Sequence, residues 1–238
     1  MLIQKYNYQK INRKTVKGKR HYDTPDGNPV ASVTTILDAT KPAEAKRALN
    51  EWRKRTDKQH GKGTAAKITK EAADRGTKMH AYLEEFCKTD SIEPVVARQK
   101  IPRESILTSQ GYQMANIVID NGLDRLDECW GVEASLYYSG LYAGTTDCCG
   151  VFASKDSIVD FKQTNRPKRR EWIDDYFMQL VAYGEAHNNM FGTKIKNGVI
   201  LMCSKDLKYQ EFVLEGNEWD TYMHKWFDRV DQYYTNLK

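Results

Sequence analysis

Long apolar runs are missing from this chain of 238 residues. No stretch approaches the roughly 18 apolar residues that a helix needs to cross a bilayer. The first residues also hold no apolar segment of the kind found in secretory signals. Mean hydropathy is −0.72 and 29% of the residues are charged. These features exclude a membrane protein and lead us to expect a soluble, cytoplasmic protein with no membrane partner.

Cysteine is scarce as well. The five cysteines form no disulfide framework, which favours free thiols in a reducing compartment. Only Cys203 lies in the last 80 residues, so no C-terminal group of cysteines can hold an iron–sulfur cluster. Cys148 and Cys149 point to opposite faces of a predicted strand and are expected to be packing residues. The chain also lacks the G-x-x-x-x-G-K-[ST] motif, so we expect no ATP.

Charge is distributed unevenly along the chain. Residues 1–80 contain 19 Lys/Arg and 8 Asp/Glu, a net charge of +11, whereas the remainder has a net charge of −6. A basic part next to an acidic part suits a polyanion that is held on one side and acted on at the other. A single run such as Arg53–Arg55 is better explained as a solvated helix face, but the whole basic part favours nucleic acid.

The first half of the chain is predicted to be mainly helical. Residues 1–22 are consistent with a small hairpin, and Ser32 is a plausible helix cap. Pro42 fits the first position of a helix over 43–58, which ends before Gly61. Apolar residues at helical spacing predict further helices over 64–86 and 105–129, separated by a loop at 88–101.

The second half changes to a period of two. Residues 132–138, 141–151 and 157–163 are predicted to form three antiparallel strands, followed by a helix over 171–189 and strands over 198–204 and 209–214. The last helix begins at Asn217 and carries eight apolar or aromatic residues on one broad face, most simply a core face. This order predicts an α+β (α/β) fold, with a mixed sheet flanked by helices and a helical N-terminal lobe.

The strands near residue 150 carry the most informative polar residues. Asp160 and Lys162 are two residues apart, so their side chains leave the same face of an extended strand. The short linker at 152–156 can fold the two strands back on each other, which brings Asp147 close to Asp160. Two carboxylates that converge in this way repel each other and call for a cation, for which Mg²⁺ or Mn²⁺ with oxygen ligands is the natural choice. The alternative is that Asp160 and Lys162 form an exposed pair on the strand and that Asp147 is a turn residue.

Several motifs in this order resemble the PD-(D/E)xK nucleases of the RecB-like exonuclease branch. Within that superfamily the chain is similar to the group that comprises the mitochondrial genome maintenance exonucleases and their phage-encoded relatives. The resemblance spans roughly residues 20–215 and rests on five elements: His80, Glu133, Gly144-x-x-Asp147, Asp160-x-Lys162 and Gln179-x-x-x-Tyr183. It implies a restriction-endonuclease-like sheet core. Although the proteins that it resembles are mitochondrial, the first residues are more typical of a strand than of a transit peptide, so we expect a cytoplasmic protein, in the host cytoplasm if the chain is phage-encoded.

The resemblance also implies roles for the motif residues. Asp147 and Asp160 would be direct metal ligands, with the Phe161 carbonyl as a third oxygen ligand. Lys162 would orient the attacking water and balance charge on phosphorus. His80 would bind or neighbour the metal, although a lone helical histidine is often a packed or surface residue. Glu133 would ligate a second ion or hold a water, or it is a simple strand-end carboxylate.

Gln179 and Tyr183 are four residues apart on a predicted helix and therefore lie side by side. The resemblance implies that they line the cleft and orient the substrate strand or the catalytic lysine. Without it, Tyr183 would be assigned to the core. The catalytic residues that we predict are Asp147, Asp160, Lys162, His80, Gln179 and Tyr183.

Three groups of residues are candidates for contact with nucleic acid. Four basic residues precede the helix of Gln179 and could grip phosphates. Ser32, Thr34 and Thr35 offer hydroxyls at a helix start. Trp52 could stack on a base, with Arg53 and Arg55 beside it, although buried core is the simpler interpretation for Trp52. The four basic residues are Arg166, Lys168, Arg169 and Arg170.

The leading hypothesis from the sequence is a single nuclease domain over 1–238, with a helical DNA-gripping lobe at 30–130 and a catalytic sheet core at 131–215. We expect a metal-dependent DNA exonuclease that prefers single strands or free ends. The alternatives are a catalytically silent nuclease fold that binds nucleic acid, a structure-specific (flap) endonuclease, and a partner-binding module that uses the aromatic C-terminal helix.

Overall fold

The structure is a computed structural model that describes residues 2–27, 29–89 and 103–237. Most of the loop predicted at 88–101 lies outside the described residues. The strands are β1 (Asn12–Val16), β2 (Lys19–Asp23), β3 (Val30–Ser32), β4 (Leu126–Tyr138), β5 (Tyr142–Phe152), β6 (Lys155–Thr164), β7 (Asn197–Ser204) and β8 (Tyr209–Glu215). The helices are α1 (Val33–Ala39), α2 (Ala43–His60), α3 (Thr64–Thr89), α5 (Arg103–Thr108), α6 (Gln110–Asn121), α7 (Asp174–Phe191) and α8 (Gly216–Thr235), with short 3₁₀ turns at Leu123–Arg125 and Arg170–Trp172.

The described strands form one mixed sheet of eight, in the order β1-β2-β3-β5-β6-β7-β8, with β4 paired to β5 outside this path. β3–β5 and β6–β7 are parallel, and the other pairs are antiparallel. Helix α7 makes the crossover between β6 and β7, as a parallel pair requires. The α+β class with a mixed sheet and flanking helices is therefore confirmed.

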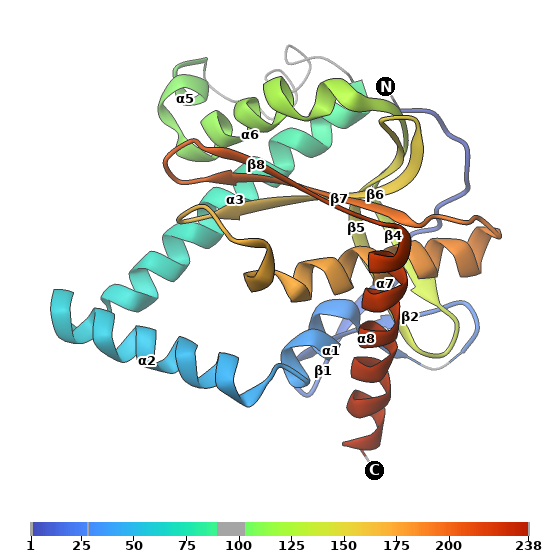
Figure 1. The fold of residues 1–238 in the computed structure, drawn as a ribbon, viewed down its shortest axis with the longest axis horizontal. Coiled ribbons are helices and arrows are strands. Elements are labelled where there is room, and N and C mark those ends of the chain that lie inside the picture. Colours follow the sequence, from blue (N-terminus) through green and yellow to red (C-terminus); the bar gives the residue numbers. More distant parts are fainter. Residues whose placement is uncertain (1, 28, 90–102, 238) are drawn as a thin grey trace.

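Helices cover both faces of the sheet (Figure 1). On one face α3 and α6 bury Met79, Leu83 and Met114 against Val159 and Phe161 of β6. On the other face α1, α7 and α8 pack over a larger core that includes Ile158. Alternate residues of β6 therefore face different cores. The adjacent Cys148 and Cys149 divide between the two cores in the same way, as predicted.

Two predicted helix starts are close to those observed. Ser32 caps α1, and its hydroxyl accepts a hydrogen bond from the Thr35 N–H at 3.0 Å. Pro42 is the residue before α2 rather than its first residue. Helix α2 extends away from the sheet and meets α3 at Gly61–Gly63 (Figure 1), and only Thr56 of its residues is buried.

The helix predicted over 105–129 is wrong in its last part, from residue 122 onward. The described helix α6 ends at Asn121, and β4 begins at Leu126. A Cβ atom at Gly122 would lie 2.5 Å from the Tyr209 hydroxyl, so glycine is needed where the chain passes close to β8. Residues from Leu126 onward pair with β5, and these ladder hydrogen bonds override the helical spacing of the apolar residues.

The C-terminal helix is part of the core, as its apolar face predicts. Trp219, Trp226 and Val230 are buried, and Met223 and Phe227 pack against the same core. The alternative of a partner-binding aromatic helix is not supported, because the chain itself covers this face. Among the described residues no helix combines the length and apolarity that a membrane span requires.

Candidate metal-dependent active site

The site forms where strand β5 changes partner. Its residues 148–152 pair with β6, and residues 142–143 pair with β3. Asp147 lies between these two stretches, and its Oδ2 accepts a hydrogen bond of 2.7 Å from the Phe161 N–H. The carboxylate thus satisfies a β6 backbone donor at the end of the β5–β6 ladder, and the approach of Asp147 to β6 that the sequence predicts is observed.

Three side chains from three elements converge at this point. His80 of α3 places Nδ1 3.2 Å from Asp147 Oδ1. Glu133 of β4 completes the group, because one ligand atom each from His80, Glu133 and Asp147 lie within 4.8 Å of one another. A cluster of two carboxylates and an imidazole could hold a divalent cation. The sequence predicted all three residues, separated by up to 67 positions.

The backbone of Glu133 is unusual. Its φ is +48°, a left-handed conformation that costs a residue with a Cβ about 1 kcal/mol or more. Val132 and Ala134 pair with Cys148 and Thr146, so Glu133 stands opposite Asp147 in the β4–β5 ladder. The distortion therefore coincides with the position at which the two carboxyl groups face each other.

Asp160 and Lys162 form a buried ion pair instead of joining that cluster. Lys162 Nζ lies 2.5 Å from Asp160 Oδ2, and the Asp160 side chain is only 2% exposed. This contact confirms that the two side chains share a face of β6. Among the described residues the cluster of candidate ligands does not include Asp160, because its carboxylate is turned toward Lys162. Its role as a ligand, and that of the Phe161 carbonyl, stay predictions.

Side chains of helix α7 also contact Lys162. Lys162 Nζ donates a hydrogen bond of 3.1 Å to Gln179 Oε1, and Gln179 Nε2 donates one of 3.3 Å to the Tyr183 hydroxyl. The Tyr176 ring lies beside Lys162, with Nζ 5.0 Å from its centroid. The i, i+4 spacing of Gln179 and Tyr183 thus produces the contact that the sequence predicted, and it positions Lys162.

Tyr183 is itself buried in the core that α7 covers, and its place along a substrate cleft stays a prediction. A Cβ atom at Gly144 would lie 2.7 Å from Tyr183 Cε1. Gly144 is therefore the position that lets the Tyr183 ring pack against β5. The face of β6 that carries Asp160 and Lys162 meets polar side chains of α7, namely Gln179 and, through it, Tyr183.

The electrostatics of the site are strongly perturbed. Burial opposes ionisation of Asp147, but His80, Lys162 and the Phe161 N–H outweigh it and hold the pKa of Asp147 below its usual range. Burial raises the pKa of Asp160 to about 6 despite the opposing charge of Lys162. Burial and the nearby Asp147 and Glu84 carboxylates raise the pKa of Glu133 to about 7. Surplus negative charge of this kind favours cation binding.

The two basic groups of the site both favour their charged forms. Burial opposes charge on Lys162, but Asp160 and Asp147 raise the pKa of the ammonium above its usual value. Burial likewise opposes charge on His80, and Asp147 raises the pKa of the imidazole. Lys162 is consequently a positive charge at neutral pH, suited to meeting an anion and unsuited to accepting a proton.

Two residues next to the site were missed from the sequence. Glu84 lies one helical turn beyond His80 and pairs with Lys88 at 2.5 Å. It borders the hollow that His80, Glu133 and Lys162 also line. Gln163 follows Lys162 and approaches α3 at Gly76, where an added Cβ would lie 3.2 Å from Gln163 Cγ. The i, i+4 spacing from His80 could have identified Glu84, whereas the Gly76 contact depends on tertiary packing.

A basic groove lies beside the site, between α2, α3 and the segment that follows β6. Four of the residues predicted to contact nucleic acid line it, namely Trp52, Arg55, Arg166 and Lys168. Trp52 is half-buried at the wall of this groove. Arg75 and Lys205 line the groove too and were not predicted. The groove has a volume of about 820 Å³.

The other predicted contacts are placed less favourably. Arg53 is exposed outside the lining of this groove, and the Arg169 guanidinium stacks on Trp172 at 5.3 Å. Arg170 is held by Glu218 at 2.5 Å and by the Val213 carbonyl, so it supports the fold.

The hydroxyls at the start of α1 are mostly engaged in the cap. Ser32 and Thr35 are buried, and Thr35 Oγ1 donates to the Arg20 carbonyl at 3.0 Å. Only Thr34 of the three is exposed. Capping therefore removes two of the three predicted phosphate contacts, because their hydrogen-bonding groups already have partners.

The solved structures that match this chain are distant. An alkaline exonuclease from Laribacter hongkongensis matches with a TM-score of 0.30 and 11% identity, covering 87% of this chain and 91% of its own. A protein from Eubacterium rectale assigned as an exonuclease matches with a TM-score of 0.46 and 13% identity, over 68% of this chain and 66% of its own. At these scores they add nothing to the argument from the residues.

Sequence similarity is more informative, although no model of a known protein family matches the chain. Proteins named mitochondrial genome maintenance exonuclease 1 are 26% identical over 215 residues in Xenopus tropicalis and 24% identical over 232 residues in Mus musculus. These matches cover 86% and 91% of the chain, which spans only 57% and 64% of the relatives' length. The chain is thus a relative of the mitochondrial genome maintenance exonucleases along most of its length, as its motifs indicated.

Proposed function

We propose that this protein is a divalent-metal-dependent deoxyribonuclease that acts as an exonuclease on single-stranded DNA or on free ends. The observation that carries the proposal is the convergence of His80, Glu133 and Asp147 beside the Asp160–Lys162 ion pair. The similarity to proteins named exonucleases supports it.

The ligand set suits the proposed cation. Asp147 and Glu133 offer hard carboxylate oxygens, and His80 adds a nitrogen ligand that Mn²⁺ accepts. Asp160 and the Phe161 carbonyl stay further proposed ligands. When bound, Mg²⁺ or Mn²⁺ would neutralise phosphate charge and make a bound water more acidic.

The protein's own side chains would supply the rest of the chemistry. The Lys162 ammonium, buried and charged, would donate hydrogen bonds to the phosphoryl oxygens as negative charge builds up on them. Gln179 holds Lys162 from the α7 side, so the ammonium does not have to be oriented during the reaction. Because the pKa of Lys162 is raised, we assign it no role as a general base.

The basic groove would carry the strand to this site. Arg55, Arg166 and Lys168 line it from two sides, and positive side chains bind the phosphate backbone without regard to sequence. Trp52 borders the same groove and offers an aromatic ring on which an unpaired base can stack. A groove with these contacts favours a single strand as the substrate.

The test is incubation with linear single-stranded, linear duplex and closed circular single-stranded DNA, with Mg²⁺ and with EDTA. We expect Mg²⁺-dependent degradation of the linear single strand and sparing of the circle. Asp160→Asn should abolish cleavage, while Asp156→Asn, at the exposed start of the same strand, should not. Cleavage of the circle would favour an endonuclease, and binding without any cleavage would favour a catalytically silent nuclease fold.

Cation binding can be tested separately from cleavage. Mn²⁺ should raise the melting temperature of the unaltered protein, because a ligand that binds only the folded state stabilises it by about 2.7 kcal/mol at 100 times its Kd. Asp147→Asn should largely remove this shift, and Asp156→Asn should leave it intact. An equal Mn²⁺ effect on both variants would contradict the proposed site.

A further inference from the structure

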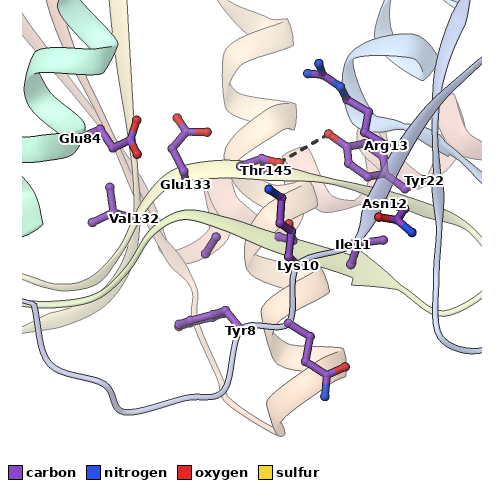
Figure 2. A pocket seen from close by; sticks show the side chains of 13 residues that line it. Tyr8, Lys10, Ile11, Asn12, Arg13, Tyr22, Glu84, Val132, Glu133 and Thr145 are labelled. Carbon is purple, nitrogen blue, oxygen red and sulfur yellow. Dashed lines mark hydrogen bonds between the residues drawn. The ribbon is translucent and has the colours of Figure 1, made fainter. Parts of the chain in front are cut away.

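A second cavity opens beyond the candidate metal ligands His80, Glu133 and Asp147, and its lining shares no residue with the basic groove. It has a volume of about 780 Å³ and lies between the N-terminal segment and strands β4 and β5. Figure 2 shows its lining, with the Glu84 and Glu133 carboxylates at one end and Lys10 and Arg13 toward the other. None of the sequence motifs predicted this cavity.

The cavity continues a path that follows helix α3. The basic groove ends at Glu71 and Arg75. The next hollow is lined by Gly76 and His80 and reaches Glu84 and Glu133. The second cavity begins at these same two acidic residues. A strand that enters by the groove and passes Lys162 therefore meets the cavity next.

Opposite charges mark the two ends of the cavity. Lys14 is paired with Asp23, whereas within the described residues no carboxylate lies at ion-pair distance from Lys10 or Arg13. Two basic side chains without an acidic partner in this part of the structure are available to an anion.

Hydroxyl groups lie between the two ends. The Tyr22 and Thr145 hydroxyls are 3.5 Å apart, and the Lys10 side chain extends toward Thr145 in Figure 2. Thr145 is two residues from Asp147 on the same face of β5, roughly 7 Å along the strand. An extended nucleic-acid strand advances by about one nucleotide over such a distance. Val132 and Ile11 add apolar surface to the lining.

We propose that this cavity is a subsite for the nucleotide next to the scissile phosphate. Lys10 and Arg13 bind the phosphate of that nucleotide, the Thr145 and Tyr22 hydroxyls donate hydrogen bonds to it, and its sugar and base lie on the apolar wall. The inference rests on the proposed function, because it takes the metal cluster to be the place where the strand is cut.

The test compares the double variant Lys10→Gln/Arg13→Gln with the control Lys17→Gln. Lys17 is exposed in the turn between β1 and β2. Binding of a short oligothymidylate is measured in EDTA at several salt concentrations. For the double variant we expect Kd to rise about five- to tenfold at low salt and the salt dependence to fall by about one phosphate contact. In Mg²⁺ the KM should rise while kcat stays within about twofold. The control should match the unaltered protein.

The outcomes separate the two proposals. If the unaltered protein binds the oligonucleotide but does not cleave it, the proposed function fails and the binding comparison still decides the subsite. If the double variant binds and cleaves like the control, the subsite is refuted while the nuclease proposal stands. Failure of the unaltered protein to bind the oligonucleotide would overturn both.

Discussion

At the scale of single residues, Lys162 is held by contacts from two elements, β6 and α7. Its ammonium contacts Asp160 and Gln179 and lies over the Tyr176 ring. These contacts place a positive charge beside Asp160, whose carboxylate would otherwise be buried without a counterion. They also leave the ammonium little freedom to move when an anion arrives, which is the condition for efficient electrostatic stabilisation.

We predict that Lys162→Gln lowers kcat by about 100-fold or more, because the amide cannot neutralise charge on the phosphoryl group. The control is Lys155→Gln, on an exposed position of the same strand. Cleavage rates and melting temperatures of both variants should be measured together. A Lys162→Gln protein that is folded and retains most of its kcat would contradict the role given to this lysine.

Glu133 combines an unfavourable backbone conformation with a carboxyl group that faces another carboxylate. We predict that Glu133→Gly raises the free energy of unfolding by about 1 kcal/mol, because glycine adopts φ +48° without strain. The same change should weaken Mn²⁺ binding. Urea unfolding and the Mn²⁺ shift in melting temperature measure the two effects.

The control for this prediction is Ala153→Gly, at φ +49° in the turn between β5 and β6. It should stabilise the fold to a similar degree and leave Mn²⁺ binding unchanged. If Glu133→Gly destabilised the fold, the carboxyl group would have to stabilise the folded protein by more than the backbone strain costs.

At the scale of elements, the site depends on how closely α7 approaches β5. Gly144 and Tyr183 are the point of contact, and Tyr183 also bonds to Gln179, which holds Lys162. A small displacement of α7 would therefore reach Lys162 through two hydrogen bonds. Packed interiors transmit such changes because they contain little free volume.

We predict that Gly144→Ala destabilises the protein by about 1–3 kcal/mol and lowers activity, since the new methyl group would lie 2.7 Å from the Tyr183 ring. The loss of stability should be smaller in a Tyr183→Leu background, where the ring is absent. Urea unfolding of the four proteins in this double-mutant cycle gives the coupling. Strictly additive effects would show that the two positions do not interact.

At the scale of the whole molecule, the N-terminal segment is tied to α7 by a chain of hydrogen bonds. Cys149 S–H donates to the Tyr8 oxygen at 3.1 Å, and the Tyr8 hydroxyl bonds to His187 Nε2 at 2.9 Å. His187 Nδ1 bonds to Thr193 Oγ1 at 2.8 Å, and that hydroxyl donates to Asn188. Only a neutral imidazole with its proton on Nδ1 satisfies every partner.

The hydrogen bonds of neutral His187 predict that the folded protein loses stability in acid. Burial lowers the pKa of His187 to about 4. The stabilisation is complete above the unfolded value near 6.5 and is lost as pH falls toward 4, by about 3 kcal/mol at most. The measurement is the free energy of unfolding between about pH 7 and pH 5, which should fall less steeply in His187→Gln than in the exposed control His224→Gln. Equal slopes would contradict the assignment.

The basic groove is also a property of the whole molecule, because α2, α3 and the segment after β6 build it together. We predict that Arg55→Gln/Arg166→Gln lowers the salt dependence of DNA binding by about two phosphate contacts. Lys194→Gln is the control, since Lys194 is exposed and lies outside the groove lining. An unchanged salt slope in the double variant would place the strand elsewhere.

Much of the fold follows from local patterns in the sequence. The alternation around Asp160 and the apolar stripe of the last helix predicted β6 and α8 closely, because strand and helix periods are imposed by the backbone itself. The helix over 105–129 was predicted too long, because a β ladder with β5 decided its last part. Such pairing partners are far away in the chain and leave no local pattern.

The same division applies to the site. Motif order in the sequence predicted His80, Glu133, Asp147, Lys162 and the Gln179–Tyr183 pair as site residues, and the structure brings their side chains together in two adjoining groups. Tertiary structure alone decided that α7 covers Asp160 and Lys162, that Thr35 bonds to the Arg20 carbonyl, and that a cavity with acidic and basic ends lies beyond the His80, Glu133 and Asp147 side chains. Each of these depends on distances between segments that are remote in the chain, and burial and hydrogen-bond competition set those distances only when the whole chain is packed.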